Sequence, residues 1–207
     1  MMCVMKTNPD FSLENRQSGV VAGVDEAGRG PLCGPVVAGA VIFPRRDIEI
    51  PVVIRDSKQM SATQRDAAYD WITHNTIWAV GECSPAEIDK LNILWASMRA
   101  MERAVENLGC APDFCLVDGN RVPAGLRGSP VVKGDAKSIS IAAASIVAKV
   151  TRDRLMHELA QKCPEYGWEK NAGYPTPEHL QAIKKYGINE HYRRSFSPVK
   201  KILEQGI

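Results

Sequence analysis

Two adjacent acids, Asp25 and Glu26, follow a short apolar run and lead directly into a glycine-rich stretch that contains one arginine. The run Val20–Val24 is β-branched and short, as expected of a buried strand. Successive side chains on a strand point to opposite faces, so the two acids can share a site only if the chain bends between them. The stretch Gly28-Arg29-Gly30 lets a ligand approach bare peptide groups. This combination suits a site for divalent metal and phosphate, although solvated turn residues have the same composition.

Two further apolar runs also end in an acid, Asp118 after the first and Asp135 after the second. If the three strands are neighbours in one sheet, all four carboxylates converge, and their mutual repulsion favours cation binding. Carboxylate oxygens without nearby histidine or cysteine favour Mg²⁺ or Mn²⁺ over zinc. Two such ions about 4 Å apart would activate water and stabilise the leaving oxygen in phosphodiester cleavage.

Other acidic sites remain open at this point. A metal-free acid/base pair, as in glycosidases, needs only two acids and no loop suited to phosphate. A structural calcium site also uses acids, usually from one contiguous loop. The three recurrences of strand and acid favour the metal-dependent hydrolase.

The elements that must position these acids alternate between strands and helices. The run Val36–Phe43 follows the first strand too closely for a helix to intervene, so the two should form an antiparallel hairpin. Further strands are expected over Ile77–Cys83, Asp113–Gly119 and Pro130–Asp135, and helices from Ser61 to about His74, Ser84 to Gly109, Ser138 to about Gln161, Pro177 to Tyr186 and after Pro198. This order predicts a mixed α/β sheet with helices on its faces, in which ligands bind where strands end.

Composition predicts one globular domain. The chain has 207 residues, of which 44% are hydrophobic and 24% charged, and no apolar run reaches the roughly 18 residues that span a bilayer. Residues 1–17 do not resemble a secretory signal and are expected to be a poorly ordered leader to a domain over 18–207. The six cysteines form no C-x-x-C pair, which disfavours a zinc site or disulfide framework and predicts reduced thiols in a cytoplasmic protein.

Charge is distributed unevenly along the chain. From residue 133 onward there are 13 Lys and Arg against 8 Asp and Glu, whereas residues 1–132 carry 13 against 16. An acidic site in the first part and a basic C-terminal part would suit a metal-dependent enzyme that holds a polyanion. A basic run taken alone is more often a solvated face.

Several segments together resemble bacterial ribonuclease HII, the type 2 ribonuclease H family. They run in the family's order from about residue 18 to 199. They are Val24-Asp25-Glu26-Ala27-Gly28-Arg29-Gly30-Pro31, Asp56-Ser57-Lys58, Val117-Asp118-Gly119, Lys133-Gly134-Asp135, Ala142–Val150, Gly173-Tyr174-Pro175-Thr176 with His179, and Arg193-Arg194-Ser195-Phe196. Tyr192 is a small departure, since the family often has arginine near this place.

The resemblance implies a ribonuclease H-like fold, with a mixed five-stranded sheet flanked by helices and a small helical C-terminal extension over about 165–207. It implies an endoribonuclease that cleaves the RNA strand of RNA–DNA hybrids and nicks duplex DNA 5′ to embedded ribonucleotides, leaving 3′-hydroxyl and 5′-phosphate ends. The family's four metal-binding acids fall on Asp25, Glu26, Asp118 and Asp135, which are the residues that the strand ends select.

The same resemblance assigns the substrate contacts. The Gly28-Arg29-Gly30 loop is expected to sense the 2′-hydroxyl, the one group that distinguishes RNA from DNA at a single nucleotide. Tyr174 is expected to stack on the neighbouring sugar. Phosphate contacts that position the duplex without reading its sequence are expected from Lys58, Arg193 and Arg194.

Four other residues have no settled role in the sequence: Ser145 and Lys149 either support the site or pack beside it, and His179 and His191 are weak candidates for general bases. A monomer is expected. Two other functions are considered: a resolvase-like DNA nuclease, which needs no 2′-hydroxyl sensor, and a binding module without catalysis, which would not need all four acids.

Overall fold

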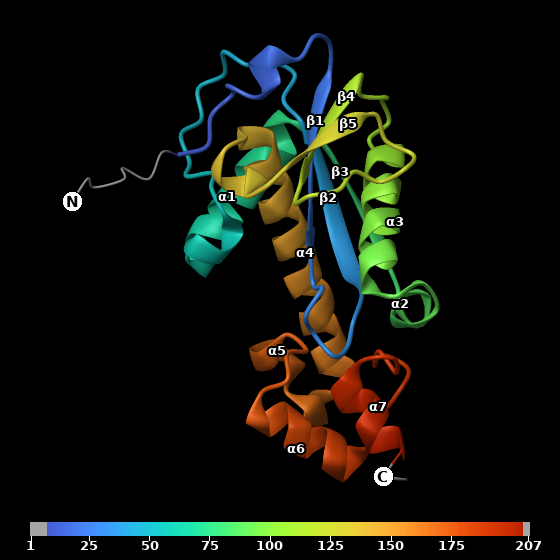
Figure 1. Cartoon of the computed structure of the whole chain (residues 1–207). Helices are drawn as coiled ribbons and strands as arrows, with labels where there is room; N and C mark the ends of the chain where they lie inside the picture. Colours follow the sequence, from blue (N-terminus) through green and yellow to red (C-terminus); the bar gives the residue numbers. More distant parts are fainter. Residues whose placement is uncertain (1–7, 205–207) are drawn as a thin grey trace, which may run out of the picture.

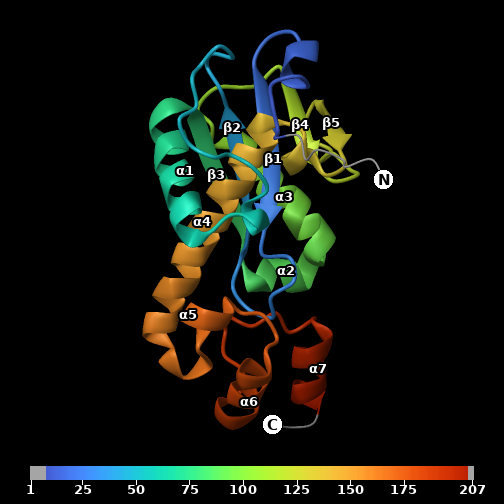
Figure 2. The ribbon, with the colours of Figure 1, turned by 90° about the vertical axis from the view of Figure 1, so that its left-hand side faces the viewer.

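The computed structural model describes residues 8–204, which form a five-stranded mixed sheet with helices on both faces and a helical extension at one end (Figures 1 and 2). The strand order is β3-β2-β1-β4-β5. The strands are β1 (Val21–Ala27), β2 (Val36–Ile42), β3 (Ile77–Cys83), β4 (Phe114–Asp118) and β5 (Gly128–Val131). β1 pairs antiparallel with β2 and parallel with β4, which confirms the expected hairpin and the mixed sheet.

The helices form two layers and the extension. α1 and α4 cover one face of the sheet, and α2 and α3 cover the other (Figure 1). The helices are α1 (Ala62–Asn75), α2 (Pro85–Leu91), α3 (Ile93–Glu106), α4 (Ile139–Lys162), α5 (Trp168–Asn171), α6 (Pro177–Tyr186) and α7 (Ser197–Glu204). No helix in the described part of the chain is long and apolar enough to cross a membrane.

Helix starts follow the sequence signals closely. Ser61 caps α1 in a capping box with Gln64, as the spacing predicts. Ser138 caps α4 by accepting a hydrogen bond from the amide of Ile141. The starts of α1 and α4, the two helices that cover one face of the sheet, are therefore fixed by these caps.

α4 lies unusually close to the sheet because two strand positions lack a side chain. A Cβ at Gly23 would overlap the backbone of Ser140, and one at Gly39 would overlap the carbonyl of Ala144. Ala144 and Ala148, the residues of α4 opposite Gly39, are small and fully buried. This close packing fixes α4 behind the end of β1, where the acids lie.

The expected helix from Ser84 to Gly109 is wrong in one respect, because it is two helices. Asn92 separates α2 from α3 with φ 63°, a conformation that L residues seldom adopt. Its side chain accepts hydrogen bonds from the amides of Leu94 and Trp95, so it caps the second helix. The apolar spacing continues across the break and therefore conceals it.

The expectation of a poorly ordered leader over residues 1–17 is wrong for residues 8–17; residues 1–7 lie outside the described part. Glu14 is 2% exposed and accepts hydrogen bonds from the Ser138 hydroxyl and the Ser140 amide. Asp10 forms a β-bridge with Ser138. This segment therefore packs against the start of α4.

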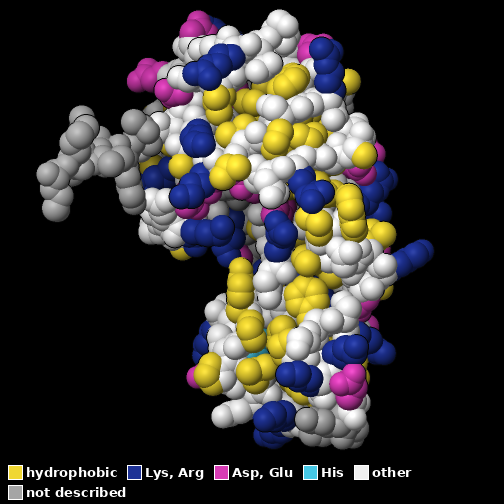
Figure 3. Space-filling model, viewed as in Figure 1, with side chains coloured by type: hydrophobic (Ala, Val, Ile, Leu, Met, Phe, Trp, Pro, Cys, Tyr) yellow, Lys and Arg dark blue, Asp and Glu magenta, His cyan; other side chains and the backbone are white. Residues whose placement is uncertain are grey.

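The C-terminal extension has a hydrophobic cluster of its own. Trp168 stacks on Tyr166 at 4.9 Å between ring centroids, and Tyr192 and Ile183 are buried beside them. α4 continues from the sheet into this cluster (Figure 1). The long helix thus joins the sheet and the extension, and the hollow between them lies beside it (Figure 3).

Candidate active site

The sheet brings the four acids to one edge. Asp25 and Glu26 follow the last pairing of β1 with β4, which joins Val24 to Val117, and Asp118 is the next residue of β4. Asp118 pairs in turn with Val131 of β5. Asp135 does not end that strand as expected; it lies on the 3₁₀ turn Gly134–Ala136 that follows. Two neighbouring strands and the turn that follows a third therefore supply the acids.

Asp25 and Glu26 both border the same pocket although they are consecutive residues of a strand. β1 continues to Ala27 while its pairing with β4 stops at Val24, so its edge is open on that side. The bend expected between the acids is therefore not needed. The unpaired edge of β1 gives both carboxylates access to one space.

The four acids interact electrostatically. Burial raises the pKa of Asp25 well above its usual value, and the charges of Glu26, Asp118 and Asp135 raise it further. Burial also raises the pKa of Glu26, against the opposing effect of Arg29. The pKa of Asp135 is raised by burial and then by the charges of Asp56 and Asp118. A cation among these groups would relieve both the burial and the repulsion.

Asp25, Glu26 and Asp118 already accept hydrogen bonds from other groups of the protein. Asp25 accepts a hydrogen bond from the Glu26 amide at 2.7 Å, and Asp118 accepts one from the Gly134 amide at 2.6 Å. Glu26 is paired with Arg29 at 3.1 Å. Accordingly, no three His, Cys, Asp or Glu side chains among residues 8–204 are already arranged to hold a metal ion.

The donor set nevertheless fits Mg²⁺ or Mn²⁺ in its chemistry, because it consists of carboxylate oxygens whose charges oppose one another. A cation at Glu26 would compete with Arg29 for this carboxylate.

The pocket beside the acids has a volume of about 310 Å³ and lies between the sheet, α4 and the extension. Loop residues Gly28 to Gly30 form one wall, and Tyr174 forms another. Lys58 and Lys149 also line it. Figure 3 shows Lys and Arg side chains gathered around the hollow between the sheet and the extension. The structure thus brings Asp25, Glu26 and Asp135, the loop and Tyr174 to one pocket. Asp118 does not line the pocket, but its charge acts on Asp25.

Both the backbone conformation of Gly28 and the side chain packed against it require a glycine at this position. Its φ is +92°, and a Cβ there would overlap the guanidinium nitrogen Nε of Arg152. Gly30 differs, because a Cβ there would lie 3.3 Å from Cε1 of the Tyr174 ring. One glycine therefore faces the interior and the other faces the tyrosine.

Tyr174 is held by its backbone while its ring, at 45% residue exposure, stays accessible. Its carbonyl lies 2.8 Å from Nδ1 of His179, which is fully buried. Nε2 of His179 lies 3.1 Å from the Trp168 indole nitrogen, which can only donate, and 2.8 Å from the Tyr192 hydroxyl. The ring therefore donates from Nδ1 and accepts at Nε2.

His179 cannot serve as a general base in this position. Burial lowers its pKa, and both ring nitrogens are engaged. His191 packs edge-on against Trp168 in the extension's cluster. His179 therefore holds the backbone of Tyr174, whereas His191 belongs to the cluster of the extension.

Arg193 does not occupy the position expected of a phosphate contact. It is fully buried, and its guanidinium donates to the carbonyls of Gly28, Arg29, Gly34 and Pro35 at 2.6–3.1 Å. Because its donors are directed at the loop backbone, a phosphate cannot reach them without unfolding this region. The neighbouring Arg194 is exposed, and only its amide is fixed, by Asp89.

Lys58 is presented by a short turn. The Asp56 side chain accepts the Lys58 amide at 2.9 Å and caps the 3₁₀ turn Ser57–Gln59. Ser145 of α4 accepts the amide of Ser57 and is buried beside the pocket. Lys149, one turn further along α4, is paired with Asp153 at 2.7 Å. Ser145 therefore braces the turn that carries Lys58.

Two residues of this region receive no role from sequence reasoning. Asp56 borders the pocket and acts on the pKa of Asp135, although its motif alone does not indicate this. Arg152 is 1% exposed and reaches the same loop as Arg193. A basic residue in an amphipathic helix usually faces solvent, so no signal in the sequence distinguishes Arg152 from its exposed neighbour Arg154.

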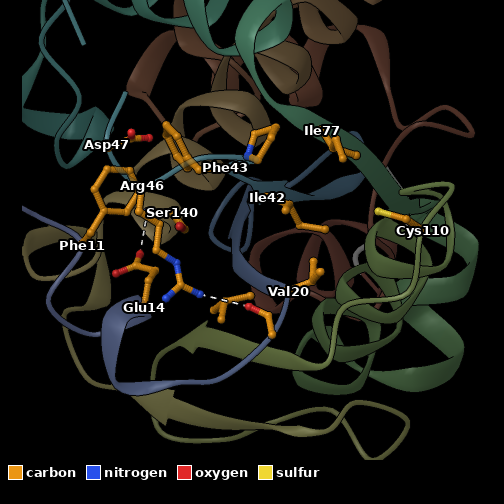
Figure 4. A pocket seen from close by; sticks show the side chains of 13 residues that line it. Phe11, Glu14, Val20, Ile42, Phe43, Arg46, Asp47, Ile77, Cys110 and Ser140 are labelled. Atoms are coloured by element: carbon orange, nitrogen blue, oxygen red, sulfur yellow. Dashed lines mark hydrogen bonds between the residues drawn. The ribbon is translucent and has the colours of Figure 1, made fainter. Parts of the chain in front are cut away.

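A larger pocket, of about 700 Å³, lies at the opposite end of β1 and β2. Its walls include the apolar side chains of Val20, Ile42 and Phe43, with Arg46 donating to the Gly19 carbonyl at its side (Figure 4). None of the four acids lines it. Although this pocket is larger, it lacks the acids on which the predicted chemistry depends.

Known proteins resemble this chain over nearly its full length. The family model "Ribonuclease HII" matches residues 22–199. The ribonuclease HII of Magnetococcus marinus is 56% identical over 94% of this chain and 95% of its own, and that of Ruegeria pomeroyi is 54% identical over 96% and 87%.

Solved structures agree with this. The ribonuclease H2 of Pyrococcus horikoshii OT3 has a TM-score of 0.76 and 31% identity, covering 90% of this chain and 98% of its own. The structure of the PCNA:RNase HII complex from Archaeoglobus fulgidus has a TM-score of 0.74 and 27% identity, covering 86% and 95%. The ribonuclease H-like fold is therefore confirmed, and the chain belongs to the ribonuclease HII family of endoribonucleases, which act on nucleic acid.

Proposed function

We propose that this endoribonuclease hydrolyses the RNA strand of RNA–DNA hybrids and nicks duplex DNA on the 5′ side of an embedded ribonucleotide. The observation that carries the proposal is the single pocket bordered by the acidic edge of β1, the loop Gly28–Gly30 and Tyr174. The acids suit phosphodiester hydrolysis, and the loop and tyrosine suit recognition of one sugar.

Asp25, Glu26, Asp118 and Asp135 would hold two divalent cations, Mg²⁺ or Mn²⁺. When bound, such ions supply an activated water and stabilise the leaving 3′-oxygen. The reaction adds water across the P–O3′ bond, so that the upstream strand ends in a 3′-hydroxyl and the ribonucleotide keeps a 5′-phosphate. The raised pKa values of Asp25 and Asp135 support cation binding here, and so does the mutual repulsion of the carboxylates.

The protein's own groups would select and orient the substrate. The loop backbone can approach the 2′-hydroxyl, which both donates and accepts hydrogen bonds. The exposed Tyr174 ring can stack on the adjacent sugar, where a hydroxyl would crowd it. Arg29, once released from Glu26, and Lys58 can contact phosphates and fix the position of the duplex. Arg194, which is exposed, is a further candidate for a phosphate contact. The sequence also predicts a monomeric, cytoplasmic protein.

The test uses a labelled DNA duplex that contains one ribonucleotide, incubated with protein in Mg²⁺ or in chelator. The proposal predicts a nick 5′ to the ribonucleotide in Mg²⁺ and an intact strand in chelator. An all-DNA duplex of the same sequence is the control and should stay intact in both. A strand that stays intact in Mg²⁺, or a nick that persists in chelator, would contradict the proposal.

A further inference from the structure

Two buried arginines support the loop Gly28–Gly30 from beneath. Arg193 donates two hydrogen bonds to carbonyls of the loop, those of Gly28 and Arg29, and two to Gly34 and Pro35 after it. Arg152 of α4 packs directly under Gly28 and donates to Cys33, Pro35 and Ala172 at 3.1–3.2 Å. Both guanidiniums reach the carbonyl of Pro35. Neither arginine forms an ion pair with a carboxylate within residues 8–204, and both are at most 1% exposed.

This arrangement is costly for a purely structural contact. Burying a charge without a counter-ion opposes folding, and here two like charges are buried together. Burial, followed by the charge of Arg152, lowers the pKa of Arg193 to about 9. Apolar side chains would join the loop to the extension at a lower cost in free energy.

The hydrogen bonds fix the orientation of two peptide groups. In a trans peptide the N–H points away from the C=O of the preceding residue. Because the carbonyls of Gly28 and Arg29 point inward to Arg193, the amides of Arg29 and Gly30 point outward. Neither amide donates to an acceptor in the part of the chain that the structure describes. Both residues border the pocket beside the acids.

We propose that Arg152 and Arg193 are positioning residues that determine discrimination between ribose and deoxyribose, although both are buried. Arg193 holds the carbonyls of Gly28 and Arg29 inward and so keeps two amide donors directed at the place where a 2′-oxygen would lie. Arg152 supports this arrangement by packing under Gly28 and by sharing the Pro35 carbonyl with Arg193. The inference rests on the proposed 2′-hydroxyl recognition and extends it to residues behind the loop.

A merely structural role would have a different signature. If the two arginines only join the extension to the sheet, their replacement lowers stability and weakens binding of every duplex alike. If they orient the amides, replacement weakens binding of the ribonucleotide-containing duplex selectively. The ratio of the two affinities therefore separates these roles.

The experiment measures binding of two labelled duplexes, identical except for one 2′-hydroxyl, by fluorescence anisotropy in chelator. The proteins are wild type, Arg193→Lys, Arg152→Lys and the matched control Arg154→Lys, whose side chain is exposed on α4 and lies over Tyr69. Lysine keeps the charge but cannot reach several carbonyls at once.

The wild type should prefer the ribonucleotide duplex, and Arg193→Lys should lower this preference about tenfold, the effect of losing one to two hydrogen bonds. Its affinity for all-DNA duplex should stay within about twofold of wild type, and Arg154→Lys should change neither value. If Arg193→Lys does not fold, Arg152→Lys tests the same claim from α4. An unchanged preference in a folded variant, or equal losses on both duplexes, would overturn the inference. A wild type without preference would overturn the 2′-hydroxyl recognition itself.

Discussion

Asp25 is a buried acid surrounded by like charges. It is 7% exposed and faces the charges of Glu26, Asp118 and Asp135. Its raised pKa means that the native protein retains a proton that the unfolded chain releases near pH 4. Native stability therefore falls as pH rises through the window between the unfolded and folded pKa values, and above it the ionised carboxylate opposes folding.

Asp25→Asn should consequently raise the melting temperature in chelator at pH 8 by a few degrees, since about 1 kcal/mol corresponds to roughly 2–4 °C in a chain of this size. The gain should shrink as pH is lowered, because a growing fraction of wild-type Asp25 is then protonated and no longer opposes folding. Mg²⁺ should stabilise wild type and not the variant, which should also lose cleavage. Asp70→Asn, at an exposed position of α1, is the control for differential scanning calorimetry. A melting temperature lowered by Asp25→Asn would contradict the assignment.

Gly28 and Gly30 differ in what lies next to them. Gly28→Ala should cost about 1–3 kcal/mol of unfolding free energy, because of its positive φ and its overlap with Arg152. Gly30→Ala should change stability by less than about 0.5 kcal/mol, because the exposed Tyr174 ring can move, while it lowers cleavage of a single-ribonucleotide duplex about tenfold. Urea denaturation and initial rates measure both. Equal stability losses in the two variants would show that Arg152 does not pack beneath Gly28.

At the scale of elements, the sequence predicts most of what positions the site. The capping box of Ser61 and the apolar run of β1 are local signals, and local chemistry decides them. Convergence of Asp25 and Asp118 follows from parallel strands whose ends meet at one edge. Arg193 could not be placed in this way, because the carbonyls that bury it belong to residues far away in the sequence. Glu14 is similar, since its partners are on α4.

Asn92 shows where periodicity fails as a guide to helices. Its φ of 63° breaks the apolar pattern into α2 and α3, and its side chain caps α3. Asn92→Ala keeps the strained backbone and loses the cap, so it should be about 1–2 kcal/mol less stable than Asn92→Gly, which relieves the strain. Urea denaturation of both variants beside wild type checks this order. An alanine variant as stable as the glycine variant would mean that the break carries no strain.

At the scale of the whole molecule, basic side chains surround the hollow between the sheet and the extension (Figure 3). Phosphate contacts release counterions, so affinity for duplex should fall with salt at a log–log slope steeper than about −3. Lys58→Gln, beside the pocket, should make this slope shallower by about one unit. Arg45→Gln should leave it unchanged, because Arg45 follows the far end of β2 and is paired with Asp47. A slope that Lys58→Gln does not alter would remove Lys58 from the phosphate contacts.

In the proposed reaction, the acids at one sheet edge direct water at the phosphate 5′ to a ribonucleotide that the loop has recognised. The most direct measurement is mass spectrometry of the products from a single-ribonucleotide duplex cleaved in ¹⁸O-labelled water with Mg²⁺. We predict a 3′-hydroxyl on the upstream DNA and one ¹⁸O in the 5′-phosphate of the ribonucleotide. A 2′,3′-cyclic phosphate on the ribonucleotide would contradict this account, because the substrate's own hydroxyl would then have been the nucleophile.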